Sequence, residues 1–143
     1  MAENQGFTSK DAALIVSAKP SGTTATTVAS NAIDIGAISA LGVHTEPFEL
    51  EVAIPAFTAT ELPSDASLTI SIQSATDSVF TSPVTEWTKT IGDGTAFAGG
   101  SFRIRPELRA NEFWRVAVLT TLANSGAVAD TAQAKAVSLS YVC

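Results

Sequence analysis

The chain contains 143 residues, of which 45% are hydrophobic and 15% are charged, with 14 acidic side chains against 8 basic ones. This length suits one domain with a sizeable core, and the formal net charge of −6 argues against a nucleic-acid partner held by phosphate neutralisation. The single cysteine, Cys143, excludes a disulfide between two residues of this sequence.

The first ten residues are polar and include a glycine, so we expect residues 1–10 to form a flexible arm ahead of a single domain at 11–143. The arm lacks the basic stretch of a signal peptide. The first apolar run, at 12–16, is too short to span a bilayer. We therefore expect a protein that is made in the cytoplasm and has no membrane partner.

Beyond the arm, apolar and polar residues alternate with a period of two, which is typical of strands with one buried face. The clearest example is 48–54, which ends at Pro55. The stretch 114–119 is apolar on nearly both faces, which predicts a strand at the centre of a sheet or at a subunit contact. In chain order, the predicted strands are 14–17, 31–35, 48–54, 68–73, 84–91, 101–104, 114–119 and 137–141.

The connections between these strands indicate how the sheets are joined. Three of them, 36–47, 56–66 and 124–131, are too long for tight hairpins, which favours strands that cross between two sheets. The alanine-rich segment 124–136 has no apolar stripe, so we predict a loop there instead of a helix. The predicted fold is therefore all-β, a sandwich of about eight strands of the jelly-roll type.

The residues that could carry chemistry are few. His44 is the only histidine and no G-x-S-x-G motif occurs, while one histidine and one cysteine are too few for a typical zinc site. Asp93-Gly94 is primarily a turn signal, although a loop calcium ligand is the alternative. Glu49 and Glu51 are about 6–7 Å apart on one strand face, a spacing that could suit a glycosidase or pairing with arginine on the next strand. We predict no enzyme, no metal and no cofactor.

The charges are unevenly spread, with a net −8 in residues 1–88 and a net +2 in 89–143. Either acidic strands pair with basic ones across a sheet, which the sequence favours, or the surface has separate acidic and basic regions that orient a partner. Arginine and aromatic residues, which are enriched at interfaces, are concentrated between 103 and 115. With two residues of the arm, they form the predicted protein–protein interface: Arg103, Arg105, Arg109, Phe113, Arg115, Lys10 and Phe7.

Three stretches carry a resemblance to a known family. The segment SNAIDIG at 30–36 resembles an early S-T-N-x-I-D-L-G signature, and LTISIQSATDSVF at 68–80 resembles a strand that leads into a T-S-x-D-x-x-F turn. The third stretch, FWRVAV at 113–118, is similar to an aromatic-rich Y-L-R-L strand. Together they resemble the jelly-roll capsid cement (decoration) proteins of tailed bacteriophages. Phe113 and Trp114 replace the usual Tyr-Leu pair, a departure that affects the contact surface.

The resemblance implies a virion structural protein without catalytic residues. It implies a homotrimer on the outer surface of the phage head, where it binds and stabilises the lattice of the major capsid protein after synthesis in the host cytoplasm. The alternative is a carbohydrate-binding jelly-roll module, or a structural component of a tail or adhesin. In that case Trp87, between Glu86 and Thr88, is a better stacking platform than Trp114, which we expect to be buried.

Overall fold

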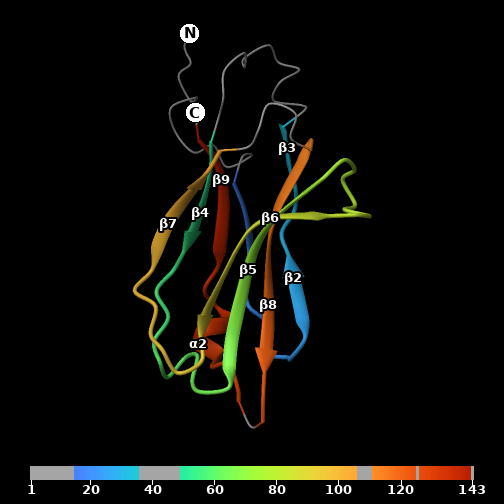
Figure 1. The fold of residues 1–143 in the computed structure, drawn as a ribbon. Helices are drawn as coiled ribbons and strands as arrows, with labels where there is room; N and C mark the ends of the chain where they lie inside the picture. The colour runs from blue at the N-terminus through green and yellow to red at the C-terminus, as the bar shows by residue number, and fades with distance from the viewer. Residues whose placement is uncertain (1–14, 36–48, 106–110, 125, 143) are drawn as a thin grey trace.

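The computed structural model describes residues 15–35, 49–105, 111–124 and 126–142 as two antiparallel sheets that pack face to face (Figure 1). Sheet A contains, in spatial order, β1 (Ile15–Ala18), β9 (Val137–Val142), β4 (Glu49–Ile54) and β7 (Gly100–Ile104). Sheet B contains, in spatial order, β2 (Thr26–Ala29), β8 (Phe113–Leu122), β5 (Ala66–Ala75) and β6 (Val84–Gly92), and β3 (Ile33–Asp34) pairs with β8 beyond β2. The predicted arm, His44 and Cys143 lie outside the described residues.

The strand order is that of a jelly roll, as predicted. Of the described strands, the first, β1, pairs with the last, β9, while β2 pairs with β8, β4 with β7, and β5 with β6. The chain therefore folds like a long hairpin that has been rolled up, and β5 and β6 are the innermost pair. Most successive strands among those described alternate between the two sheets. The exceptions are β2 and β3, which both pair with β8, and β5 and β6, which both lie in sheet B.

The core lies between the sheets and follows the predicted alternation. Leu68, Ile70 and Ile72 of β5 are fully buried, whereas the residues between them point outward and are partly exposed. Trp114 is 1% exposed, as expected, and its Nε1 donates a hydrogen bond to the carbonyl of Asn111 at 2.7 Å. Its strand, β8, lies between β2 and β5, so its apolar character reflects a central position in the sheet.

Two elements differ from the sequence prediction. Strand β2 was not predicted, because Val28 is its one large apolar residue; it forms because β8 offers a paired edge, with Val28 opposite Val118. The prediction of an uninterrupted loop over 124–136 is wrong, since α2 (Asp130–Gln133) makes one helical turn there. The turn buries Ala132 completely, and this tertiary contact stabilises a helix too short to have an apolar stripe.

An ion pair fixes the end of the sandwich where α2 lies. Lys135 Nζ is 2.7 Å from Glu61 Oε1 and also donates to the carbonyl of Ala56 at 2.7 Å. Glu61 and Thr58 form a capping box, in which Thr58 N donates to Glu61 Oε1 at 2.9 Å and Glu61 N donates to Thr58 Oγ1 at 3.0 Å. Lys135 and these backbone contacts lower the pKa of Glu61 to about 2. The long connection between β4 and β5 is thereby tied to the segment before β9.

Candidate interaction surfaces

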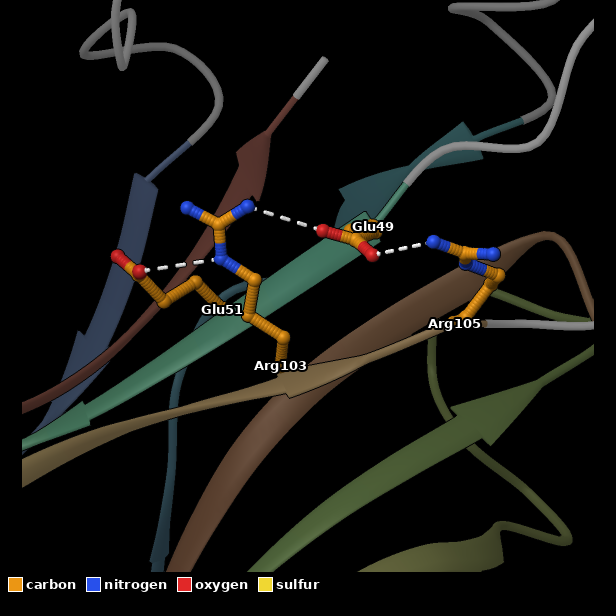
Figure 2. A network of polar contacts seen from close by, with 4 residues as sticks. All are labelled: Glu49, Glu51, Arg103 and Arg105. Atoms are coloured by element: carbon orange, nitrogen blue, oxygen red, sulfur yellow. Dashed lines mark hydrogen bonds and ion pairs between the residues drawn. The ribbon is translucent and has the colours of Figure 1, made fainter.

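Two of the predicted interface arginines lie on the outward face of sheet A and bind glutamates of the neighbouring strand (Figure 2). Arg103 Nη1 donates to Glu49 Oε1 at 3.0 Å, and Arg103 Nε is 3.6 Å from Glu51 Oε2. Arg105 Nη2 donates to Glu49 Oε2 at 2.8 Å. We call Glu49, Glu51, Arg103 and Arg105 the charged cluster. For these four residues, the acidic side chains of the first part of the chain pair with basic side chains of the second part, because β4 lies next to β7.

The charged cluster has no net charge, which limits what it can do. The hydrogen bonds from Arg105 and Arg103 hold the pKa of Glu49 below its usual range, and Glu49 in turn raises the pKa of Arg103. Glu49 is thus kept ionised, whereas a catalytic general acid needs a raised pKa. The arginine side chains stay more than half exposed, at 55% for Arg103 and 68% for Arg105. Their remaining N–H groups can therefore donate to a partner, but without a long-range field to attract it.

The other described members of the predicted interface lie at the start of β8, on the outward face of sheet B. The guanidinium of Arg115 lies 4.1 Å from the ring centroid of Phe80, and its Nε donates to Gln73 Oε1 at 2.9 Å. Burial lowers the pKa of Arg115. Phe113 is half-buried and lies between Asp34 of β3 and Ala75 of β5.

The fold brings the described candidates to one end of the sandwich. The end of β7 and the start of β8 both lie at the end opposite α2 (Figure 1). There, the pKa of Glu112 is raised, because Glu112 can donate a hydrogen bond to the carboxylate of Asp34 only when it is protonated. Lys10, Phe7 and Arg109 lie outside the described residues, so their part in an interface stays a prediction.

A broad surface that the sequence did not single out covers the outward face of sheet B. Apart from Arg115 and from Glu86 at the bulge of β6, the outward positions of its four main strands hold uncharged residues, most of them small. One row across the sheet runs Thr27, Leu119, Thr69 and Thr90, and the Oγ1 atoms of Thr69 and Thr90 are 3.2 Å apart. We call this surface the sheet B face, formed by Thr27, Ala29, Ser67, Thr69, Ser71, Thr88, Thr90, Leu119 and Thr121.

The predicted turn at Asp93-Gly94 is present and has a structural role. Both residues have positive φ angles, 56° and 80°, as the two central residues of a type I′ turn require, and Thr95 N donates to the carbonyl of Gly92 at 3.2 Å. Asp93 Oδ1 accepts a hydrogen bond from the backbone N–H of Asp65 at 2.9 Å. Within the described part of the chain, no three His, Cys, Asp or Glu side chains are grouped so that they could hold a metal ion. No helix among these residues has the length and apolarity needed to cross a membrane.

Comparison with known proteins gives only weak similarity. No family model matches the chain, and no curated protein matches it. One similar solved structure is titled "Crystal structure of PirA"; it is 10% identical, has a TM-score of 0.40, and the alignment covers 89% of this chain and 90% of that chain.

Proposed function

We propose that this chain is a virion structural protein, a capsid cement or decoration protein. In this proposal it binds the outer surface of a phage head as a homotrimer and stabilises the lattice of the major capsid protein. The family resemblance of the sequence supports the proposal, and so does the jelly-roll topology, with β1 paired to β9 and β5 to β6. The chain would be made in the host cytoplasm and would join the virion there.

The observation that carries the proposal is the sheet B face. A protein that clamps a shell needs a wide surface that can lose its water at low cost. Charged side chains are depleted at the centre of interfaces because an imperfectly paired charge is costly to desolvate. Thr69, Ser71 and Leu119 lie next to one another on this face without a charge among them. Small side chains also lose little conformational entropy when a partner covers them, unlike lysine or glutamate.

The charged cluster and the sheet B face would then have different roles. Hydroxyl groups on a flat sheet can both donate and accept hydrogen bonds, so the face adapts to a partner's backbone. The exposed guanidinium groups of Arg103 and Arg105 offer fixed directional donors at one end. A trimer repeats both surfaces three times, so that individually weak contacts act together through effective concentration.

The test is binding to undecorated shells of a phage whose genome encodes this chain. We expect the wild type to cosediment with undecorated mature shells and to raise their resistance to heat. Ser71→Lys, which places a charge at the centre of the sheet B face, should weaken binding about 10- to 100-fold. The matched control is Ser138→Lys on the outward face of sheet A, where the residue is similarly half-buried.

The two parts of the proposal fail separately. If the wild type does not bind mature shells, the decoration role is overturned. If Ser71→Lys folds normally and binds as tightly as Ser138→Lys, the sheet B face is not the contact surface.

A further inference from the structure

At the open edge between β6 and β7, two aromatic rings flank one lysine, and a third ring packs beside one of them. Trp87 and Lys89 point to the same side of β6 as the buried Ile91. The rings of Trp87 and Phe102 have centroids 5.4 Å apart, tilted by 38°. Lys89 Nζ is 5.5 Å from the ring centroid of Phe102 and 5.6 Å from that of Phe97. We call Trp87, Lys89, Phe97 and Phe102 the edge cluster; its rings pack against the core but remain partly exposed.

The charge of Lys89 is not neutralised by the described residues. Within the described ranges, its ammonium group makes only the two cation–π contacts, and no carboxylate there forms an ion pair with it. The carboxylate nearest in sequence, Glu86, instead accepts a hydrogen bond from Ser74 at 2.6 Å. An ammonium group has three N–H donors and aromatic rings accept none of them strongly. The edge cluster therefore presents a positive group beside ring faces.

The same edge is built against the addition of another strand. The register of β5 and β6 shifts between Ile72 and Gln73, which marks a bulge beside Trp87. A bulge and an inward-pointing lysine are two of the features by which edge strands avoid pairing with other chains. A peptide that extends the sheet is thus a poor fit, whereas a ligand that lies against the rings from the side needs no regular backbone pairing.

We propose that the edge cluster is a binding site for an acidic saccharide. One sugar ring would lie against Trp87 and Phe102, whose faces suit the apolar C–H surface of a pyranose. Its carboxylate would accept a charge-assisted hydrogen bond from Lys89, which distinguishes uronic-acid-like sugars from neutral ones. This site goes beyond the decoration role and is independent of it, because it is tested on the free protein without shells.

The experiment is a fluorescence titration with a matched pair of probes, a galacturonic acid oligosaccharide and its fully methyl-esterified form. Trp87 is partly exposed and Trp114 is 1% exposed, so a change on binding reports on Trp87. We expect saturable quenching by the acidic probe and binding about tenfold weaker for the ester, since the charge-assisted hydrogen bond is lost. The proposal is overturned if the acidic probe causes no saturable change, or if both probes bind equally.

Substitution of Lys89 gives the second arm. Lys89→Met keeps the packing of the aliphatic stem but removes the charge, so it should abolish the preference for the acidic probe. The matched control is Lys19→Met, which removes an exposed lysine that is distant in sequence and should leave the preference unchanged. If Lys89→Met is poorly folded by circular dichroism, Lys89→Gln measured by calorimetry answers the same question. If a folded Lys89 variant still binds the acidic probe more tightly than the ester, Lys89 does not bind the carboxylate, and its role is only to cover the rings at the edge of the sandwich.

Discussion

The outward faces of the two sheets differ, although both sheets turn alternating apolar residues inward. Sheet A carries the charged cluster, in which two glutamates and two arginines neutralise one another across β4 and β7. The sheet B face has no such charges and relies on hydroxyl and methyl groups, as at Thr69 and Thr90. The few charged side chains are therefore distributed unevenly between the two outward faces. On sheet A they are paired with one another within the chain, whereas a partner can cover the sheet B face without burying an ion.

The largest expected effect separates the inward from the outward side of sheet B. Ile70 is fully buried in the middle of β5, so Ile70→Ala should lower the free energy of unfolding by about 2–5 kcal/mol. Ser71→Ala, one position along the strand and facing outward, should change it by less than about 0.5 kcal/mol. Urea denaturation followed by circular dichroism measures both. Equal losses would mean that the outward face also contributes packing to the monomer.

An intermediate effect is expected where an ion pair is more buried than those of the charged cluster. Glu61 is 7% exposed and bound to Lys135, so Glu61→Gln should lower the melting temperature by about 5 °C. Because the folded-state pKa is depressed from 4.5 to about 2, the carboxylate stabilises the fold fully above pH 4.5 and loses this contribution as the pH falls toward 2. The melting temperature should therefore fall more steeply between pH 7 and pH 2 for the wild type than for Glu61→Gln. Parallel curves would contradict the assignment.

The smallest expected effect is in the charged cluster itself. Arg103→Gln removes a guanidinium that is 55% exposed, and exposed ion pairs contribute little to stability because water and salt screen them. We expect the melting temperature to fall by no more than about 2 °C, and the difference to shrink in high salt. The pKa of Glu49 should rise toward its usual value, which carbon-detected NMR titration can follow, since Arg103 is one of the two residues that lower it. A large loss of stability would show that the pairing organises sheet A.

The sequence predicts the inward side of the molecule well and the outward side poorly. Alternation in stretches such as 68–73 is imposed by burial, so it is visible in the chain. Strand β2 and helix α2 are not visible, because each forms on a surface provided by residues far away in sequence. The pairing of Glu51 with Arg103 depends on a register between strands about fifty positions apart, which no local pattern encodes. The sheet B face was missed because serine and threonine on alternate positions look like any solvated strand.

The pairing of β1 with β9 has a consequence for how the protein is made. During synthesis, Ile15–Ala18 leaves the ribosome long before Val137–Val142 exists, so sheet A cannot close until Val137–Val142 has been translated. Non-local pairing of this kind is slow to form, whereas the β5–β6 hairpin can form early. A nascent or truncated chain thus exposes unpaired strand edges, and premature termination should yield aggregates instead of smaller working fragments.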